Sequence, residues 1–339
     1  MRSPVTLVTG AGGEIGHGLI ARLRAAGRAI VTIDIAPLPP ELARLVDREF
    51  VGSVTDTGLL ERILAQFEIE LVFHLAALLS TRSEFTPLSA HQVNVDGTLH
   101  LLEFAQREGE SHGRPVVFLY PSSIAVYGLP DLNTRHQAQA VREDQWNTPQ
   151  TMYGCNKLYC EHLGRYYSRH YKQLAAEAAL RVDFRCIRFP GLISADTVPS
   201  GGTSDYAPEM LHAAARGVPY ACFVRPDTRI PLMVMPDAID AIMRLAAAPR
   251  ERLTMTAYNT MAFNPSAEEI RAAVIRAFPG AAVAWTVDEK RQRIIDSWPE
   301  AVDDRPAREQ WGFAPRYDLA RAFEEYLAPR IRERYRGSR

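Results

Sequence analysis

The sequence predicts an α/β protein: a doubly wound parallel sheet covered by helices, followed by a smaller carboxy-terminal lobe. Short apolar runs alternate with helical stretches over residues 1–190, which is typical of parallel strands joined by covering helices. The alternation ends at a Gly/Pro/Ser-rich loop, "PGLISADTVPSGGTSDY". We therefore predict a first domain over 1–190 and a smaller lobe over 191–339 that completes a cleft, with part of its chain returning to the first core.

The individual elements follow from periodicity and composition. Buried strands are predicted at short apolar runs: 5–10, 29–34, 49–54, 71–77, 115–123 and 183–189. Helical spacing predicts helices over 14–26, 41–47, 89–108, 150–172, 207–216 and 237–247, with a further strand at 231–235. Two polar or alanine-rich stretches, 130–145 and 172–180, are predicted to be surface insertions without a site.

Composition excludes several classes of function. Lys and Arg total 39 against 40 Asp and Glu, without a long run of one sign, so neither a nucleic-acid groove nor a membrane patch is expected. No apolar run approaches the ~20 residues of a membrane span. The four cysteines and nine histidines lack metal-type spacing, so we expect no metal, and we predict free thiols in a reducing cytoplasm. A strand begins almost at the first residue, which leaves no room for a signal peptide.

A glycine-rich turn joins the first strand to the first helix. In "LVTGAGGEIGHGL", Gly10, Gly13 and Gly16 are spaced three apart, and glycines in such a turn let the backbone approach a pyrophosphate. The helix amides there, those of Glu14 and Ile15, are predicted to bind it. The strand–turn–helix context therefore predicts dinucleotide binding, with a simple strand-capping turn as the structural alternative.

An acidic residue ends the second strand. Asp34 lies 18 residues beyond Gly16. A carboxylate at this position accepts hydrogen bonds from the adenosine ribose hydroxyls and repels a 2′-phosphate. No arginine directly follows Asp34, so NAD is predicted in preference to NADP; a helix cap or a solvated turn residue is the structural alternative.

A tyrosine and a lysine share one helix face in "TMYGCNK". With 13 tyrosines and three lysines in 339 residues, ~0.1 such pairs are expected by chance. A free tyrosine has a pKa of about 10 and is a poor base at neutral pH, but a nearby cation lowers that value. We therefore predict that Lys157 lowers the pKa of Tyr153, and that Tyr153 takes the proton from a substrate hydroxyl.

Five motifs occur in order along the chain: "TGAGGEIG" (9–16), "HLAA" (74–77), "NVDGT" (94–98), "SSIAVYG" (122–128) and "YGCNK" (153–157). Together they resemble those of the extended short-chain dehydrogenase/reductase superfamily, which implies a Rossmann fold. Other segments resemble the short-chain type of L-threonine 3-dehydrogenase: "HLAALLS" (74–80), "RFPGLIS" (188–194), "GGTSDYA" (201–207), "RQRIIDSWPEAVDD" (291–304) and "AREQWGF" (307–313). Sugar-nucleotide epimerases usually have an asparagine and "GP" where this chain has "FPGLIS".

The resemblance implies roles for further residues. A Ser or Thr at the place of Ser123 orients the reacting oxygen in the superfamily, so Ser123, Tyr153 and Lys157 form the expected catalytic set. The last two also contact the cofactor, and the other expected cofactor contacts are Ser53, Val54, Leu75, Ala76, Ala77 and Asn94. Expected substrate contacts, besides Ser123 and Tyr153, are Ser80, Ser122, Gly191, Gly202 and Thr203. Relatives usually have an acidic residue near Ser53 that contacts adenine; Asp56 is the alternative here.

The implied reaction is NAD-dependent oxidation of the L-threonine β-hydroxyl to 2-amino-3-oxobutanoate. Three alternatives stay open: a dehydrogenase of another small hydroxy acid, a nucleotide-sugar 4-epimerase or dehydratase, and a non-enzymatic NAD(H) sensor, which would not need a catalytic base. As in relatives, the helices over 89–108 and 150–172 are expected to form a homodimer interface, with burial inside the monomer as the alternative. The loop 191–206 has the glycine content of a mobile lid.

Overall fold

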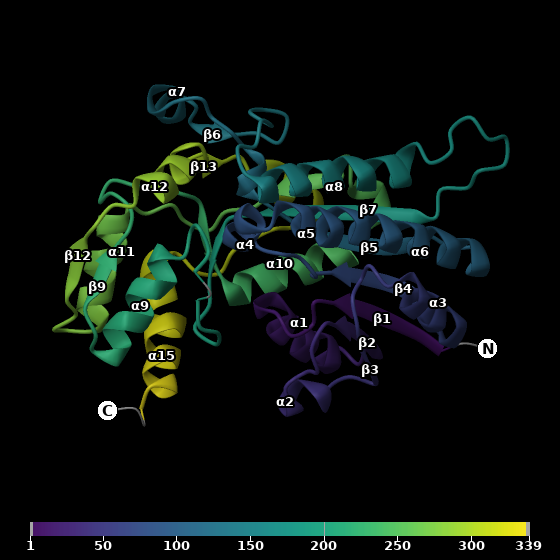
Figure 1. The fold of residues 1–339 in the computed structure, drawn as a ribbon, viewed down its shortest axis with the longest axis horizontal. Coiled ribbons are helices and arrows are strands. Elements are labelled where there is room, and N and C mark those ends of the chain that lie inside the picture. Colours follow the sequence, from purple (N-terminus) through teal and green to yellow (C-terminus); the bar gives the residue numbers. More distant parts are fainter. Residues whose placement is uncertain (1–2, 200, 337–339) are drawn as a thin grey trace.

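The centre of the molecule is a seven-stranded parallel sheet (Figure 1). A computed structural model describes residues 3–199 and 201–336. The strands lie in the spatial order β11-β7-β5-β4-β1-β2-β3, and their pairings are parallel. Their bounds are β1 (Ser3–Thr9), β2 (Ile30–Asp34), β3 (Arg48–Val51), β4 (Phe67–His74), β5 (Val116–Ser123), β7 (Val182–Phe189) and β11 (Ala257–Asn259). The predicted α/β fold with a doubly wound parallel sheet is confirmed.

Helices cover both faces of this sheet. One face carries α1 (Glu14–Ala25), α2 (Pro40–Ala43) and α10 (Met235–Ala247), and the other carries α3 (Thr57–Gln66), α6 (Gly97–His112) and α8 (Met152–Arg169). Leu7 and Val8 are neighbours on β1, yet they belong to the two opposite apolar clusters. Because alternate residues of a strand point to opposite faces, a sheet buried on both sides needs the continuous apolar runs seen in the sequence.

The strand order reverses beside β1. From β1 the chain continues outward to β2 and β3 on one side, whereas β4, β5 and β7 lie on the other. The connections that leave the carboxyl ends of β1 and β4 therefore run in opposite directions and open a crevice between them. This is the place in a doubly wound sheet where a dinucleotide binds.

The smaller lobe lies at one end of the sheet, at the left of Figure 1. It contains α9 (Tyr206–Arg216), α11 (Ala267–Ala277), α12 (Glu289–Asp296), η4 (Ala322–Leu327) and α15 (Ala328–Arg334), with the strand pairs β8 (Gly191–Ile193) and β10 (Leu232–Val234), and β9 (Tyr220–Cys222) and β12 (Val283–Trp285). Its core also takes Tyr127 from the first half, while α10 and β11 return to the central sheet. Each core thus draws on both halves, and the division at residue 190 stays a prediction about folding units.

Short elements complete the connections. They are α4 (Ser80–Phe85), α5 (Pro87–His91), the π-helical η1 (Gln92–Asp96), η2 (Ile124–Val126), α7 (Leu132–Gln137), β6 (Ala140–Val141), η3 (Arg250–Arg252), β13 (Ala301–Val302), α13 (Arg305–Trp311) and α14 (Leu319–Arg321). The predicted helix over 89–108 is thus built from the end of α5, from η1 and from part of α6. A π-helical turn inside such a helix often marks a functional position.

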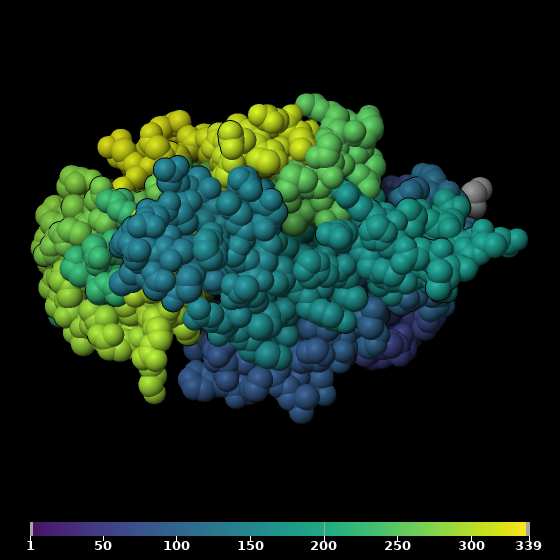
Figure 2. Space-filling view, turned by 90° about the horizontal axis from the view of Figure 1, so that it is seen from above, coloured from purple at the N-terminus to yellow at the C-terminus, as the bar shows by residue number. Residues whose placement is uncertain are grey.

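The two predicted surface insertions are both mostly exposed but differ in how they are anchored. Residues 172–180 are exposed as expected: Leu174 is fully exposed, and this segment projects at the right of Figures 1 and 2. Residues 130–145 also lie mostly at the surface, but β6 pairs with β13, and the side chain of Arg135 is only 2% exposed. The Arg135 Nε donates to the carbonyl oxygen of Trp298 at 2.7 Å. Contacts with the carboxy-terminal segment therefore anchor this surface stretch at Arg135 and at β6.

Candidate active site

The glycine turn packs tightly against the segment that follows β4. Gly10 has a φ of 65°, in the left-handed region that favours glycine, and a Cβ there would lie 2.6 Å from Ala76 N. A Cβ on Gly16 would lie 2.2 Å from the carbonyl oxygen of Ala11. Both contacts involve backbone atoms, so a larger residue would displace the turn. The two glycines therefore keep a narrow backbone cradle at the end of β1.

The first turn of α1 opens from this cradle. Gly13 is the N-cap residue, and no side chain caps the helix. The amides of Glu14 and Ile15 thus fit a pyrophosphate, which would satisfy donors that helix geometry leaves unpaired. The Glu14 carboxyl is half-buried, and its pKa is raised first by that burial and then by the negative charge of Asp205. The loop that carries Asp205, which the sequence predicts to be a lid, therefore lies close to the first turn of α1.

Asp34 is held beside the glycine turn. Its Oδ2 accepts a hydrogen bond from Gly12 N at 2.8 Å, and its Oδ1 accepts one from Ala36 N at 3.3 Å. These bonds fix the carboxylate at the mouth of the crevice while leaving lone pairs for further donors. The position fits the ribose hydroxyls of NAD.

Ser53 and Val54 follow β3 and have local contacts. Val54 is 4% exposed, and a Cβ on Gly97 of α6 would lie 2.6 Å from its Cγ2. The Ser53 Oγ lies 2.7 Å from Thr55 Oγ1 and accepts a hydrogen bond from Thr55 N at 3.1 Å. Asp56 is the side-chain cap of α3. Contacts of Ser53 or Asp56 with adenine stay predictions.

The segment after β4 is tied to the catalytic helix through Asn94. Leu75, Ala76 and Ala77 are half-buried at the crevice. The Asn94 Oδ1 accepts a hydrogen bond from Leu78 N at 2.8 Å, and its Nδ2 donates to the Leu78 carbonyl oxygen at 3.1 Å. The same Nδ2 lies 3.4 Å from the Oδ1 of Asn156 in α8. Asn94 therefore fixes the crevice wall relative to α8.

Ser123 and Tyr153 come from two elements that pack closely. Ser123 ends β5, and Tyr153 lies in the first turn of α8, which Thr151 caps by accepting a hydrogen bond from Gly154 N at 3.0 Å. A Cβ on Gly154 would lie 2.1 Å from the carbonyl oxygen of Ala125. Glycine at this place thus lets the first turn of α8 lie directly on the turn that follows Ser123.

Lys157 is buried beneath the tyrosine. Its Nζ donates to the Pro121 carbonyl oxygen at 2.6 Å and lies 4.4 Å from the Tyr120 ring centroid and 5.5 Å from that of Tyr153. Burial lowers the pKa of Lys157 to about 8. Burial also raises the pKa of Tyr153 above its ordinary value, which is opposite to the predicted direction. The cost of removing water from the ionised phenol is larger than the stabilisation by the Lys157 ammonium, which donates its hydrogen bond to a carbonyl oxygen and not to the phenol.

Three of the predicted substrate residues meet where the lid touches α4. Thr203 N lies 3.3 Å from the Ser80 Oγ, to which it donates, and the Thr81 Oγ1 donates to the Gly201 carbonyl oxygen at 2.8 Å. Gly202 lies between these two lid contacts. The structure therefore brings Ser80, Gly202 and Thr203 together from segments far apart in the chain.

The other two substrate candidates lie in strands. Ser122 is 3% exposed at the end of β5, and within the described part of the chain its hydroxyl has no hydrogen-bond partner. Gly191 begins β8, where a Cβ would lie 2.7 Å from Leu232 Cδ2. On the opposite side, Met152 N donates to the Glu84 Oε1 at 2.7 Å, which joins α4 to the first turn of α8. The lid, α4 and α8 thus form one connected wall.

The sequence analysis missed a buried ion pair behind the catalytic helix. Arg188 of β7 donates to Glu161 of α8 through Nη2–Oε2 at 2.6 Å and Nε–Oε1 at 2.9 Å, and the two side chains are 4% and 6% exposed. The Arg188 Nη1 also donates to the Tyr127 hydroxyl at 2.9 Å. Glu161 lies one helical turn beyond Lys157. The sequence did contain a signal for this pair: Arg188 lies inside the apolar strand "DFRCIRF", and a buried charge needs a partner of opposite charge.

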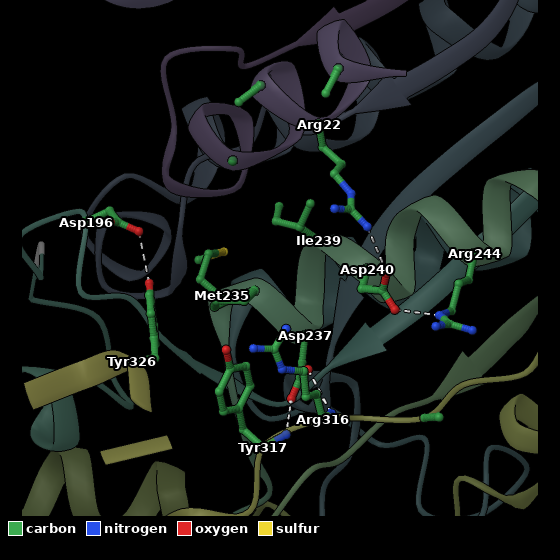
Figure 3. A pocket seen from close by; sticks show the side chains of 15 residues that line it. Arg22, Asp196, Met235, Asp237, Ile239, Asp240, Arg244, Arg316, Tyr317 and Tyr326 are labelled. Carbon is green, nitrogen blue, oxygen red and sulfur yellow. Dashed lines mark hydrogen bonds and ion pairs between the residues drawn. The ribbon is translucent and has the colours of Figure 1, made fainter. Parts of the chain in front are cut away.

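A cavity of about 580 Å³ lies behind α1, and its lining includes none of the three predicted catalytic residues. Figure 3 shows that Asp240, in the wall of this cavity, forms ion pairs with both Arg22 and Arg244. The Tyr326 hydroxyl donates to the Asp196 Oδ2 at 3.1 Å. The cavity therefore lies where α1 and α10 meet the carboxy-terminal segment and the loop that carries Asp196. The polar contacts in it hold these elements together.

Residues 3–199 and 201–336 contain neither a candidate metal site nor a helix that could span a membrane. No group of three or more His, Cys, Asp or Glu side chains in these ranges is placed to bind a metal ion. No helix in the same ranges combines the length and the hydropathy of a membrane span.

The model of the NAD dependent epimerase/dehydratase family matches residues 6–260. The chain belongs to this family. It is an NAD-dependent oxidoreductase with NAD as its cofactor, as the glycine turn and Asp34 predicted. Membership also confirms the resemblance to extended short-chain dehydrogenases/reductases.

Relatives within the epimerase/dehydratase family align over nearly the whole chain. The mitochondrial L-threonine 3-dehydrogenase of Bos taurus is 34% identical over 314 residues, which is 92% of this chain and 79% of the relative. An uncharacterized epimerase/dehydratase of Staphylococcus haemolyticus is 36% identical over 318 residues, 93% of each chain.

Solved structures of this kind superpose closely. The L-threonine dehydrogenase from Clostridium difficile has a TM-score of 0.85 at 31% identity, covering 98% of this chain and 99% of that one. The holo form of a GalE-like L-threonine dehydrogenase from Cupriavidus necator has a TM-score of 0.83 at 32% identity, covering 96% and 99%. The same Rossmann-type arrangement is therefore shared along almost the full length.

Proposed function

We propose that this chain oxidises the β-hydroxyl of L-threonine to 2-amino-3-oxobutanoate. The likeness to L-threonine dehydrogenases over nearly the full chain supports this substrate. The observation that carries the proposal is the contact between Ser80 and the lid residue Thr203. Threonine is a small zwitterion, and a site for it needs a few short polar groups that bind a carboxylate and an ammonium group. Ser80, Ser122, Thr203 and the backbone of Gly202 are such groups.

In this proposal Tyr153 is the general base and Ser123 orients the substrate. The Ser123 Oγ accepts a hydrogen bond from Ala125 N at 3.1 Å, so its own proton remains available for the reacting oxygen. The phenolate oxygen of Tyr153 takes the proton of the β-hydroxyl, and the β-carbon loses a hydride as the carbonyl forms. Bound NAD supplies the hydride acceptor and a positively charged ring.

Positive charge is needed here because burial opposes ionisation of Tyr153. Lys157 contributes one positive charge, and the carbonyl oxygen of Pro121 that accepts its hydrogen bond does not cancel it. The ammonium therefore has two roles in the proposal: it favours the phenolate, and it would donate a hydrogen bond to the nicotinamide ribose.

The test of substrate is the formation of NADH, followed by absorbance, with L-threonine, small hydroxy acids and UDP-glucose in parallel. We expect turnover with L-threonine; its absence at high substrate concentration would remove the proposal, and turnover with a hydroxy acid alone would replace it. The test of the base is Tyr153→Phe, which should reduce turnover by about 10²–10⁴-fold while NAD still binds. Tyr159→Phe, which alters an exposed residue of the same helix, is the matched control.

We further propose that the chain forms a homodimer through the surface around α5 and α8. Phe85 of α4, Leu88 of α5 and Tyr166 of α8 are 82%, 72% and 40% exposed, and a partner subunit could cover these large side chains. Sedimentation equilibrium should give twice the mass of the chain, and Leu88→Glu should shift the mass toward that of a single chain; a wild-type monomer at micromolar concentration contradicts this.

The four free cysteines support the cytoplasm as the compartment.

A further inference from the structure

A buried chain of hydrogen bonds links β1, β4 and α6 beneath the glycine turn. His74 ends β4 and is 1% exposed. Its Nδ1 lies 2.8 Å from Thr9 Oγ1, and its Nε2 lies 2.9 Å from Thr98 Oγ1. At one end of the chain, the Thr98 Oγ1 donates to the Asn94 carbonyl oxygen at 2.5 Å. At the other end, Ala76 N donates to the Thr9 Oγ1 at 3.3 Å.

One assignment of donors and acceptors satisfies all of these hydrogen bonds together. A hydroxyl has a single proton, and that of Thr98 goes to the carbonyl oxygen, so Thr98 must accept the Nε2–H of His74. In a neutral ring the Nδ1 is then an acceptor, and it takes the proton of Thr9. The Thr9 oxygen is left to accept the amide proton of Ala76. A doubly protonated ring would leave the Thr9 proton without a place in this chain.

The surroundings of the ring favour the same state. The ring centroids of Phe118 and Tyr120 both lie 5.9 Å from that of His74. Burial, followed by the positive charge of Lys157, lowers the pKa of His74 to about 3. A neutral imidazole is therefore expected near neutral pH.

The two ends of the chain reach the two halves of the active site. A Cβ on Gly10 would lie 2.6 Å from Ala76 N, so the backbone at Ala76 packs directly against the nucleotide turn. Asn94 contacts Asn156, which lies one residue before Lys157 in α8. A shift of the imidazole would therefore move the turn and the helix relative to each other.

We propose that His74 is a positioning residue: as a neutral Nε2–H imidazole it fixes the nucleotide turn relative to the helix that carries Tyr153 and Lys157. Its role concerns the binding of NAD and does not depend on the substrate. The tests below therefore contain no L-threonine, and their failure is distinct from failure of the proposed reaction.

The first test reads the tautomer directly. Nitrogen-15 NMR of the histidine-labelled full chain, with the His74 signals identified by their absence in His74→Gln, should show a ring protonated at Nε2 alone. The signals should not titrate between pH 5 and pH 8. A ring protonated at Nδ1, or at both nitrogens at pH 7, would overturn the proposal. The tautomer is read in the wild-type chain, and His74→Gln serves only to assign the signals.

The second test measures NAD binding by calorimetry in threonine-to-valine variants. Thr98→Val leaves the Nε2–H without its acceptor, and we expect the dissociation constant for NAD to rise at least about five-fold, with recovery in Thr98→Ser. Thr32→Val is the matched control, because Thr32 is equally buried and within the described residues its hydroxyl has no partner. Equal NAD affinity in the Thr98→Val and Thr32→Val variants would overturn the positioning role.

Discussion

Replacing Lys157 by methionine should make the stability of the protein depend on pH in a defined way. The side chain is buried, and burial lowers its pKa from 10.5 to about 8. Each tenfold change in proton affinity is worth about 1.4 kcal/mol, so the buried ammonium costs roughly 3 kcal/mol of unfolding free energy. The methionine variant has no such cost, but it leaves the Pro121 carbonyl oxygen without its donor, which costs about 1–3 kcal/mol.

The sign of the pH dependence follows from proton binding. Below pH 8 the lysine is protonated in both the folded and the unfolded chain, so the full cost is present. Between pH 8 and pH 10.5 the unfolded chain binds more protons than the folded one, and wild-type stability therefore rises with pH. Relative to Lys157→Met, the wild type should gain roughly 3 kcal/mol across this interval.

Urea unfolding of both proteins at several pH values measures this difference, and groups that titrate alike in both proteins cancel. Lys290→Met, which removes an exposed ammonium from α12, controls for the loss of a lysine. We also expect the Lys157→Met variant to be folded at pH 7 but to lose turnover. A stability difference that stays constant from pH 7 to pH 10.5 would refute the reasoning, because the ammonium would then not be desolvated.

Three further predictions follow from the site. Glu161→Gln should lower the unfolding free energy by about 3–5 kcal/mol in urea titrations, since it leaves the charge of Arg188 buried without its partner; a loss below about 1 kcal/mol would contradict this. Gly10→Ala should abolish NAD binding measured by calorimetry, because the new Cβ would lie 2.6 Å from Ala76 N; wild-type affinity would show that the turn is not the cradle. Asp34→Ala should weaken NAD binding about tenfold and reduce the preference over NADP, and an unchanged ratio of the two affinities would count against a ribose contact.

Local rules were sufficient for the parts of the site that depend on backbone conformation. The glycines of the first turn, the carboxylate of Asp34 and the spacing of Tyr153 and Lys157 could be read in order along the chain. Each is determined within one strand, one turn or one helix, so a short window contains the necessary information. The six strands predicted before residue 190 belong to the central sheet for the same reason.

Longer-range features could not be read in this way. The seventh strand, β11, is only three residues long and joins the sheet from the second half of the chain. The anchoring of residues 130–145 could not be read because β13, which pairs with β6, lies far along the sequence. The contact between Ser80 and Thr203 joins residues 123 positions apart.

The sequence by itself determined the fold class, the cofactor and the residues that carry the proposed chemistry. The tertiary structure alone decided the proton affinities in and around the site: the pKa of Tyr153 is raised where the sequence predicted a lowered one, and that of His74 is lowered to about 3. The physical reason is that proximity in sequence indicates which charges are near each other, whereas the cost of removing water depends on everything that packs around them.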